Sequence, residues 1–557
     1  MIEVHNDGPV HPSRPAAVMT SAPRPAKTRP ALGARPARAR SHLAPARPAR
    51  PAHRKADRVV PVVGIGASAG GVEAVAELLR CLPVDTGMAF VLVQHLDPDH
   101  ESLLPRVLSR ATRMPVAQVE HGVCVAADRV YVIPPNADLS LHGPVLQLSP
   151  RRAVSGHPFL PIDAFFRTLA EDRARRAIGI VLSGAASDGT DGLRAVQEHD
   201  GITLVQDPRT AKFPGMPQSA IGAGVADRVL TVPEIARELV RLSRHPYVAP
   251  VDREPTGAAD GDALRAEIRA LVRNTAGLDF DDYKPAPFER RLARRMALRE
   301  VTGLEEYAAL LRKSRPEVEA LSEDLLVRVT SFFRDPGAFD ALKAKVVPRI
   351  LARKPDGATI RVWIPGCASG EEAYSIAMAL LEMIDESRRA LGIQIFATDA
   401  SERTIEKARA GVYPEAALRE VGDERRRRYF GRVDGGYRVT KALRDLCVFV
   451  RHDLARDPPF SKVDLVSCRN VLIYFRTTLQ KKVIATFHYA LNDPGFLLLG
   501  RSENLTGFAR LFSPVDRANK LFERKAVRGG PDVGTTSTDP VPSRRPVAGQ
   551  SPASRRP

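Results

Sequence analysis

A short glycine-rich loop, Gly64-Ile65-Gly66-Ala67-Ser68-Ala69-Gly70-Gly71, joins an apolar run to a helical pattern early in the chain. The run, residues 59–65, has the length and composition of a buried strand. After the loop, apolar residues recur at helical spacing from Val72 to Leu79. The loop is therefore predicted to be a strand-to-helix turn. Its centre fits G-x-S-x-G, the turn that exposes a nucleophilic serine hydroxyl.

Two further strands of this first block end near residues that a reactive serine would need. The run 88–93 leads to His95, and the run 177–182 is followed by Asp188. In open α/β sheets, ligands bind at the edge formed by the carboxyl ends of the strands. A serine needs a base to become nucleophilic, and the base needs an acid to orient it. The pattern predicts that Ser68, His95 and Asp188 act together as nucleophile, base and acid.

The same residues leave two other interpretations open. The loop spacing is G-x-G-x-x-x-G, which departs from the dinucleotide pattern but still admits an NAD(P)-linked oxidoreductase built on Gly64. The segment from His95 to His100 also suggests a metal site, although we expect none. The substitution Ser68→Ala would separate the nucleophilic serine from the oxidoreductase, since it abolishes the chemistry of the former and spares the latter.

A second block of strand–helix alternation carries another glycine loop, Gly366-Cys367-Ala368-Ser369-Gly370, before a helix that starts at Glu371. The next strand, 393–397, ends close to Asp399, where a carboxylate can accept the ribose hydroxyls of a nucleoside. A third apolar run, 463–466, follows. The order favours a doubly wound methyltransferase over an NAD enzyme, with a purely structural βαβ unit as the alternative.

Changes in composition divide the chain into six segments. They are a basic leader rich in Pro, Ala and Arg (1–57), a first α/β domain (58–245), a linker (246–261), a small helical subdomain (262–335), a second α/β domain (336–525) and a Pro- and Ser-rich tail (526–557). Both α/β domains are expected to contain doubly wound, mostly parallel sheets. The leader and the tail are expected to be disordered, because neither can build a core.

The composition excludes several classes of protein. The hydrophobic fraction of 44% and the charged fraction of 27% are those of an ordinary soluble protein, and no run of apolar residues is long enough to predict a membrane span. The five scattered cysteines argue against a disulfide framework and favour a reducing cytoplasm. Half of the net charge of +18 lies in residues 1–55, which lack aromatic side chains. We therefore expect a solvated leader and no nucleic-acid binding.

The first block resembles the chemotaxis methylesterase family (CheB) over about residues 59–243. The similar segments are Ile65-Gly66-Ala67-Ser68-Ala69-Gly70-Gly71, Val93-Gln94-His95, Tyr131-Val132-Ile133-Pro134-Pro135, Asp188-Gly189 and Gly215-Met216-Pro217. The resemblance implies hydrolysis of glutamyl methyl esters on chemoreceptors, and also deamidation of glutamines. It implies Ser68 as nucleophile, His95 as base and Asp188 as the residue that orients the base.

This chain departs from the methylesterase family at two places near the expected oxyanion. Ala69 stands where the family often has Thr, and Ala185-Ala186 stands where it often has Met-Gly. Backbone N–H groups can still serve as oxyanion donors there. The basic leader also takes the place of the family's usual receiver domain, so we expect no control by phosphorylation within this chain.

The second block resembles the chemotaxis receptor methyltransferase family (CheR) over about residues 262–525. The similar segments are Val329-Thr330-Ser331-Phe332-Phe333-Arg334-Asp335, Gly366-Cys367-Ala368-Ser369-Gly370-Glu371-Glu372 and Cys468-Arg469-Asn470-Val471-Leu472-Ile473-Tyr474-Phe475. The resemblance implies S-adenosylmethionine as cofactor, bound by Thr330, Arg334, Gly366, Glu371, Asp399, Asp453, Leu454 and Asn470. Arg334 and Tyr474 would face the methyl transfer centre. Arg328 and Asp453 stand where the family has Asn.

Residues 288–299 form a basic amphipathic helical pattern. In the methyltransferase family, a basic helix at this place meets the acidic methylation region of the receptor, and we expect the same here. The alternative is a solvated charged face.

The two resemblances together predict a bifunctional signalling enzyme that methylates receptor glutamates and removes the methyl groups again. Its expected partners are the cytoplasmic helices of chemoreceptors, and its expected location is the cytoplasm, at membrane receptor arrays. The oligomeric state is left open. The alternatives are the oxidoreductase and a scaffold protein in which one or both sites are inactive.

Overall fold

The computed structural model describes residues 59–95, 102–151, 159–249, 258–326, 330–434 and 436–527. The predictions of a disordered leader (1–57) and of a disordered tail beyond residue 527 lie outside these residues, as does Arg328. The segment Arg58–Pro557 forms one unit by itself. It holds two large sheets, two three-stranded sheets and a helical subdomain among its described residues.

The first large sheet has the strand order β10-β9-β8-β1-β2-β5-β3, and every neighbouring pair is parallel. Its strands are β1 (Val62–Ala67), β2 (Ala89–Gln94), β3 (Val116–Gln118), β5 (Arg129–Val132), β8 (Ala177–Val181), β9 (Ile202–Gln206) and β10 (Arg228–Leu230). The central strands are buried along their whole length, as expected of a parallel sheet that is covered on both faces.

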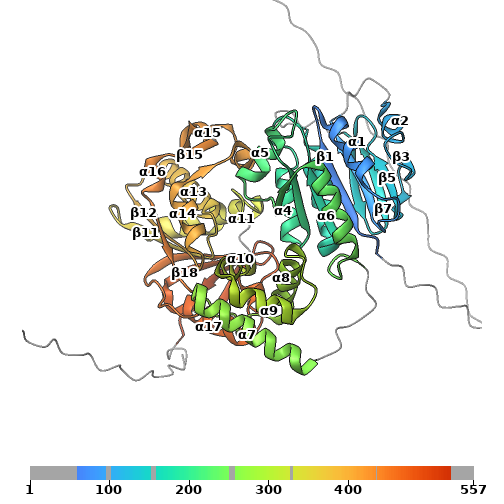
Figure 1. Ribbon diagram of the computed structural model, residues 1–557. Helices are drawn as coiled ribbons and strands as arrows, with labels where there is room; N and C mark the ends of the chain where they lie inside the picture. The colour runs from blue at the N-terminus through green and yellow to red at the C-terminus, as the bar shows by residue number, and fades with distance from the viewer. Residues whose placement is uncertain are drawn as a thin grey trace, which may run out of the picture. The chain divides into compact units, whose positions relative to one another are not determined.

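Helices cover both faces of this sheet (Figure 1). They are α1 (Gly71–Cys81), α2 (Leu104–Leu108), α3 (Pro161–Arg173), α4 (Thr190–Glu198), α5 (Gly215–Gly222) and α6 (Val232–Arg244), with a 3-10 turn η1 (Ala174–Arg176). Alternate residues of β1 pack on opposite sides: Ile65 joins the core cluster of α1 and α6, whereas Val62 joins the cluster of α3 and α4. The period of two along a strand causes this division.

A small antiparallel sheet, β4-β7-β6, interrupts the predicted strand–helix alternation. Its strands are β4 (Val123–Cys124), β6 (Ala137–His142) and β7 (Val145–Pro150). The pair β6–β7 is a hairpin closed by Gly143, whose φ of 56° lies in the left-handed region that turns of this kind use. These strands were not predicted from the sequence, because they are only partly buried and their apolar residues do not form a continuous run.

The predicted linker, 246–261, is too long at both ends. Tyr247 and Val248 are buried in the core of the first domain, and the Tyr247 hydroxyl donates to the backbone carbonyl of Asp200. The next helix already begins at Ala258. Proline and glycine suggested an open connection, but a single aromatic anchor extends the first domain. Residues 250–257 lie outside the described part of the chain.

The helical subdomain contains α7 (Ala258–Ala276), α8 (Pro285–Leu298), α9 (Leu304–Lys313) and α10 (Arg315–Leu325). It has a core of its own, which includes Ile268, Tyr307 and Leu321. Ser314 caps α10 by accepting the backbone N–H of Glu317. The helices that the sequence predicted between residues 262 and 329 are therefore present among the described residues.

The second large sheet has the order β16-β12-β11-β17-β18-β20-β19. Its strands are β11 (Thr359–Pro365), β12 (Gly392–Asp399), β16 (Cys447–Arg451), β17 (Val463–Cys468), β18 (Leu491–Leu499), β19 (Phe512–Asp516) and β20 (Leu521–Arg524). The pairs from β16 to β18 are parallel, and the pairs that involve β20 are antiparallel. The expectation of a mostly parallel sheet is confirmed, with an antiparallel edge.

The remaining elements surround this sheet. They are α11 (Pro336–Ala341), a π-helical turn η2 (Leu342–Val346), α12 (Val347–Leu351), α13 (Glu371–Ser387), α14 (Glu402–Ala410), η3 (Glu415–Val421), α15 (Asp423–Tyr429), α16 (Lys441–Arg444), η4 (Leu472–Tyr474) and α17 (Thr477–Ala490). A small antiparallel sheet, β13-β15-β14, adds Val412–Tyr413, Gly436–Val439 and Phe430–Val433. The sequence analysis did not predict these three short strands.

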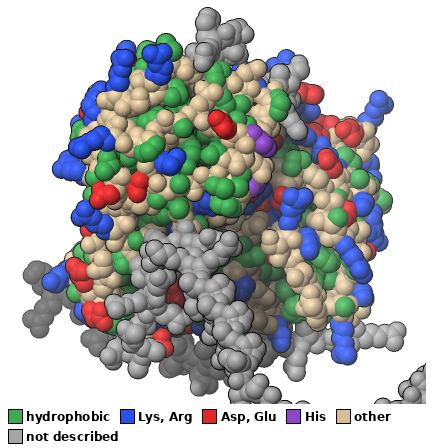
Figure 2. Space-filling model, turned by 90° about the vertical axis from the view of Figure 1, so that its right-hand side faces the viewer, with side chains coloured by type: hydrophobic (Ala, Val, Ile, Leu, Met, Phe, Trp, Pro, Cys, Tyr) green, Lys and Arg blue, Asp and Glu red, His purple; other side chains and the backbone are tan. Residues whose placement is uncertain are grey.

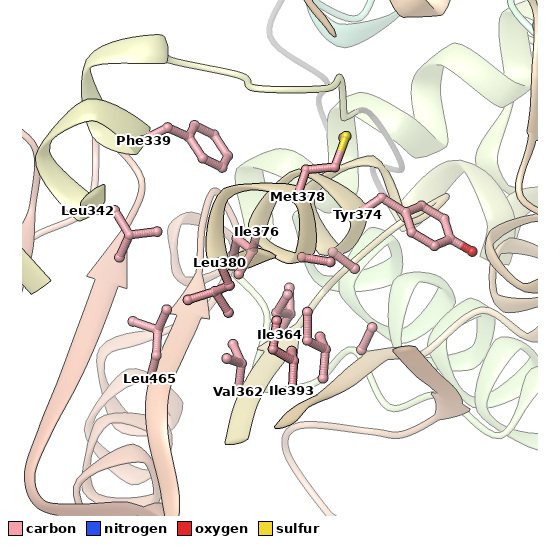
Figure 3. Packing of buried hydrophobic residues seen from close by; sticks show 14 of the residues in the cluster. Phe339, Leu342, Val362, Ile364, Tyr374, Ile376, Met378, Leu380, Ile393 and Leu465 are labelled. Atoms are coloured by element: carbon pink, nitrogen blue, oxygen red, sulfur yellow. The ribbon is translucent and has the colours of Figure 1, made fainter. Parts of the chain in front are cut away.

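Helix α13 lies in the middle of the second core (Figure 3). Its side chains Ile376 and Leu380 are buried among the strand residues Val362 and Leu465. Most of α13 is buried around its whole circumference, as is typical of a helix in the interior of a large domain. Because α13 follows directly on residues 366–370, its packing holds that glycine loop in place.

The described helices include none that is both long and apolar enough to cross a membrane. On the face that Figure 2 shows, acidic and basic side chains are interspersed with hydrophobic ones, and the Lys and Arg side chains do not gather in one patch.

Two candidate active sites

The first candidate site lies at the carboxyl ends of three neighbouring strands, β8, β1 and β2. Ser68 follows β1, His95 follows β2, and Asp188 lies in the loop between β8 and α4. The distance between His95 Nδ1 and Ser68 Oγ is 3.0 Å, and the distance between His95 Nε2 and Asp188 Oδ2 is 2.9 Å. The structure thus joins the three predicted residues into one hydrogen-bonded chain, which could move a proton from the serine to the imidazole.

Backbone groups hold the carboxylate of Asp188, which is 1% exposed. Its Oδ1 accepts the N–H groups of Asp163 and Gly189 at 3.0 and 2.9 Å, and its Oδ2 accepts the N–H of Ile162 at 3.1 Å. Ile162 and Asp163 lie in the first turn of α3, where backbone N–H groups have no partner within the helix. Two helix starts therefore fix the direction in which Asp188 faces His95.

The loop that carries Ser68 is tied to the loop after β8. The Ser68 N–H donates to the carbonyl of Ser183 at 3.0 Å, and Ser183 Oγ donates to the carbonyl of Ala69 at 2.9 Å. Gly184 allows this close approach, because a Cβ at that position would overlap Met216 and lie 3.0 Å from the Cβ of Ser68. The glycine lets two strand ends meet beside the serine.

Ala186, one of the family departures, adopts a left-handed backbone with φ of 64°. A glycine takes this conformation without cost, whereas a residue with a Cβ pays about 1 kcal/mol. The alanine is therefore strained, and it lies within the loop that runs from Ser183 to Asp188. We expect the strain to lower the stability of this loop. It does not disturb the triad acid, because Asp188 still makes its hydrogen bonds to the backbone.

The metal interpretation finds no support among the described residues. His95 uses both ring nitrogens on Ser68 and Asp188. In the described ranges, no group of three or more His, Cys, Asp or Glu side chains has the arrangement of a metal site. Residues 96–100, on which that interpretation also depended, lie outside the described part of the chain.

The second candidate site is a cavity of about 260 Å³ at the carboxyl ends of β11, β12 and β17. Seven of the predicted residues line it: Arg334, Gly366, Asp399, Asp453, Leu454, Asn470 and Tyr474. The remaining two, Thr330 and Glu371, do not. The wall also includes Glu198 and His199, which come from the end of α4 in the first domain.

Asp399 holds the glycine loop at the floor of this cavity. Its Oδ2 accepts the N–H of Ala368 at 3.0 Å, and its Oδ1 accepts the N–H of Ser401 at 3.0 Å. Gly366 has a φ of 73°, and a Cβ there would overlap the side chain of Val471. Two separate requirements, the left-handed backbone and the close approach, thus make residue 366 a glycine.

Glu371 lies behind this loop and is 8% exposed. Its Oε1 accepts a hydrogen bond from Ser369 Oγ at 3.0 Å, while its buried Oε2 has no hydrogen-bond partner among the described residues. Burial raises the pKa of this carboxyl group. At the cavity itself, the carboxylate at the end of β12 and the glycine with no room for a side chain fit a nucleoside cofactor.

Arg469 is a site residue that the sequence analysis missed, and its side chain is 2% exposed. Its Nη2 donates to the carbonyl of Arg334 at 2.7 Å and to Asp335 Oδ2 at 2.6 Å, and its Nη1 lies 3.5 Å from Glu372 Oε2. Arg469 therefore positions the segment that carries Arg334. Arg469 belongs to the motif at residues 468–475, but a sequence motif does not show which of its side chains are buried.

Glu503 is a second residue that the sequence did not indicate. Its carboxylate accepts the backbone N–H groups of Asn470, Val471, Leu472 and Gly500 at 3.0, 2.9, 2.7 and 2.7 Å. Burial raises the pKa of Glu503, and these hydrogen bonds oppose the shift. The carboxylate thus shapes the loop that presents Asn470. A lone glutamate 33 residues downstream carries no sequence signal.

Tyr474 ends the 3-10 turn η4 at the cavity wall. Burial raises the pKa of its hydroxyl, and the nearby guanidinium groups of Arg291 and Arg334 oppose the rise. The hydroxyl is therefore neutral at physiological pH and available as a hydrogen-bond donor. The helical subdomain supports this segment, because the N–H of Lys284 donates to the carbonyl of Tyr474 at 2.8 Å.

Three arginines of the basic helix α8 form ion pairs with the first domain. Arg290 and Arg291 pair with Asp200 of the first domain at 2.7 and 3.0 Å, and Arg294 pairs with Asp227 of the same domain. Arg294 is 2% exposed. The expectation of a receptor-facing helix is therefore wrong for Arg291 and Arg294, whose side chains are buried against the first domain, whereas it stays a prediction for Arg290, whose side chain is 50% exposed.

Comparison with known proteins supports each half of the chain separately. The family "CheB methylesterase" matches residues 63–239. The all-alpha domain and the SAM binding domain of "CheR methyltransferase" match residues 265–326 and 328–521. A "Putative methyltransferase Cher3" of Pseudomonas putida is 35% identical over 276 residues, which are 46% of this chain and 96% of that protein.

The chain belongs to the CheR methyltransferase family and carries a CheB methylesterase domain as well. A "Chemotaxis protein methyltransferase" of Borreliella burgdorferi is 31% identical over 42% of this chain and 86% of that protein. The recognition of both families, the α/β fold class and S-adenosylmethionine as cofactor are thereby confirmed.

One relative spans both halves. An "Uncharacterized 104.1 kDa protein in hypE 3'region" of Rhodobacter capsulatus is 39% identical over 447 residues, which are 76% of this chain. This chain spans about half (46%) of the length of that relative. Among solved structures, the CheB methylesterase catalytic domain of Thermotoga maritima is 27% identical over 33% of this chain and 98% of that chain, with a TM-score of 0.31.

Proposed function

We propose that this chain is a bifunctional enzyme of chemotactic signalling. Its second domain transfers a methyl group from S-adenosylmethionine to glutamate side chains of chemoreceptors, and its first domain hydrolyses the resulting methyl esters. The observation that supports the proposal most strongly is the hydrogen-bonded chain from Ser68 through His95 to Asp188. We assign ester hydrolysis to residues 59–248 and methyl transfer to residues 258–525.

Hydrolysis would proceed in two steps, formation of an acyl-enzyme and its hydrolysis. Ser68 Oγ attacks the ester carbonyl while its proton passes to His95 Nδ1, and Asp188 stabilises the imidazolium that forms. The proton then moves to the departing methanol, which leaves an acyl-enzyme. A water molecule, activated by the same imidazole, releases the glutamate carboxylate and restores the serine. A glutamine side chain would react in the same way and lose ammonia, which would account for deamidation.

Methyl transfer requires mainly that the cofactor and the acceptor carboxylate are positioned and that the charge of the carboxylate is neutralised. When bound, S-adenosylmethionine supplies an electrophilic methyl group. Asp399 would hold its ribose hydroxyls, and the loop at Gly366 would let the cofactor approach the backbone. The guanidinium of Arg334 can bind the acceptor carboxylate with its planar fork, and no strong base is required.

The positions of the other predicted residues support the following roles. Asp453, Leu454 and Asn470 line the cavity and would contact the cofactor, while the Tyr474 hydroxyl would donate to the acceptor. Glu371 would act from behind the lining, by holding the glycine loop through Ser369, and Thr330 stays a predicted cofactor contact. The acceptors would be cytoplasmic helices of chemoreceptors, which would recruit the enzyme to receptor arrays.

The test uses the full chain, labelled S-adenosylmethionine and membranes that carry candidate chemoreceptors. Variants Ser68→Ala and Asp399→Ala serve as matched controls for each other, because each should lose one activity and keep the other. We expect base-labile label on the receptor that increases in Ser68→Ala and disappears in Asp399→Ala. Absence of label in every variant, on membranes that a known receptor methyltransferase labels, would refute the transferase half.

A further inference from the structure

A side chain of the methyltransferase domain contacts residues next to the triad of the methylesterase domain. Arg419 lies in η3, between β13 and α15. Its Nη1 donates to Asp163 Oδ2 at 2.6 Å and to Asp191 Oδ2 at 3.3 Å, and its Nη2 donates to Ser187 Oγ at 2.9 Å. One guanidinium group thus binds three side chains of the other domain, with the geometry that suits its planar fork.

The three partners of Arg419 surround the acid of the triad. Ser187 directly precedes Asp188, and the N–H of Asp163 donates to Asp188 Oδ1 at 3.0 Å. Asp163 Oδ1 in turn accepts the N–H of Gly192 at 2.7 Å, which ties the start of α3 to the start of α4. Arg419 therefore clamps the same two helix starts that orient Asp188.

The positive charge of Arg419 also offsets the repulsion among the neighbouring carboxylates. Asp163, Asp188 and Asp191 are three carboxyl groups in one small region, and Asp163 and Asp188 are each 1% exposed. Burial, followed by repulsion from Asp188 and Asp191, raises the pKa of Asp163 to about 6, and Arg419 opposes the rise. A cation bound between two of the three carboxylates lets them stay ionised together.

We propose that Arg419 is a positioning residue for ester hydrolysis, supplied by the methyltransferase domain, which holds Asp188 in the orientation that His95 requires. The inference rests on the proposed function, because it assigns Arg419 a role in that reaction. On this proposal, the esterase site is complete only when the η3 segment of the second domain is in place. The two activities would then be joined in one chain for a structural reason.

The test compares Arg419→Ala and Arg419→Lys with the unchanged full chain. Arg427→Ala is the matched control, since Arg427 is an exposed arginine of the neighbouring α15. The readouts are kcat and KM for hydrolysis of methylated receptor between pH 5 and 8, methyl transfer, and deuterium exchange of peptides that cover residues 159–173 and 187–199.

For Arg419→Ala we expect kcat for hydrolysis to fall roughly 10-fold, with little change in KM, because a charge-assisted contact near the triad is lost. Methyl transfer should be unchanged, and exchange should be faster at the starts of α3 and α4. Arg419→Lys should retain part of the activity, since it keeps the charge and loses the fork. Arg427→Ala should behave like the unchanged chain in every readout.

The pH profile separates positioning from a merely structural effect. The groups that face Asp163 are Asp188, Asp191 and Arg419, with His95 beyond Asp188 and Arg194 beyond Asp191. Without the Arg419 cation, the pKa of Asp163 rises further, so the acid limb of the kcat profile should move to higher pH in Arg419→Ala. In Arg419→Lys the limb should stay close to that of the unchanged chain.

Two outcomes would count against different claims. If the unchanged chain hydrolyses no ester, the proposed function fails, while the exchange measurement still reports on Arg419. If exchange at residues 187–192 is the same in Arg419→Ala and in the unchanged chain, Arg419 does not hold the triad loop, and the inference is overturned whether or not the chain is an esterase.

Discussion

The two candidate sites differ in what holds their catalytic groups in place. In the first, the backbone N–H groups of Ile162, Asp163 and Gly189 contact Asp188 directly, and the support proposed for Arg419 reaches Asp188 only through its neighbours. In the second, buried charged side chains do this work: Glu503 shapes the loop at Asn470, and Arg469 positions the Arg334 segment. Backbone donors survive almost any substitution, whereas a buried charge fails with the loss of one side chain. The methyltransferase site should therefore be the more sensitive of the two to substitutions outside its lining.

The largest expected effect is the loss of one activity without the other. Ser68→Ala removes the nucleophile, so esterase kcat should fall on the order of 10⁴-fold or more, while methyl transfer and thermal stability stay unchanged. The measurement is release of labelled methanol from methylated receptor, with Asp399→Ala as the control that keeps this activity. A Ser68→Ala chain that still releases methanol at the original rate would contradict the assignment of the nucleophile.

The second prediction tests the dependence of the methyltransferase site on buried charge. Glu503→Ala leaves several buried backbone N–H groups without an acceptor, and we expect a loss of about 4 kcal/mol in the unfolding free energy of that domain, with no cofactor binding. Glu503→Gln keeps one acceptor oxygen and should lose less. Urea unfolding and calorimetric titration with S-adenosylmethionine measure the two effects. Normal cofactor binding by Glu503→Ala would show that the loop does not need this carboxylate.

The third prediction concerns pH and the first site. The pKa of Asp163 is raised from 3.8 to about 6 in the folded chain, chiefly by burial. Because the folded state binds this proton more tightly than the unfolded state, stability should decrease as pH rises from about 4 through 6, by up to about 3 kcal/mol. Asp163→Asn should lack this decrease. Urea unfolding at pH 5 and pH 7.5 provides the comparison, and identical pH dependence in both chains would exclude the effect.

The smallest expected effect concerns backbone strain in the loop that runs from Ser183 to Asp188. Ala186→Gly relieves a left-handed alanine but adds entropy to the unfolded chain, so we expect a net gain of about 0.5 kcal/mol. Ala185→Gly is the matched control, because residue 185 is not among the described positions with positive φ, and it should lose stability. Thermal unfolding of the two variants would decide between them. Equal destabilisation by both glycines would show that residue 186 is not strained.

Parts of both sites could be predicted because their signals are local. Ser68, His95, Asp188 and Asp399 each follow an apolar run, and parallel strands bring their carboxyl ends to one edge of a sheet. The glycine at 366 was equally visible as part of a strand-to-helix loop. The antiparallel strands β4, β6 and β7 were missed because they are only partly buried, so they lack the continuous apolar run of the central strands.

The sequence by itself determined the two α/β domains, their central parallel strands and the residues at the ends of those strands, because these depend on periodicity within a few residues. Only the tertiary structure decided which charged side chains meet. Arg419 binds Asp163 from 256 positions away, and Arg290 pairs with Asp200 from 90 positions away. An isolated arginine or glutamate has no local pattern, and its partner is chosen by packing between distant elements. For that reason the helix expected to face a receptor turned out to bind this chain's own first domain.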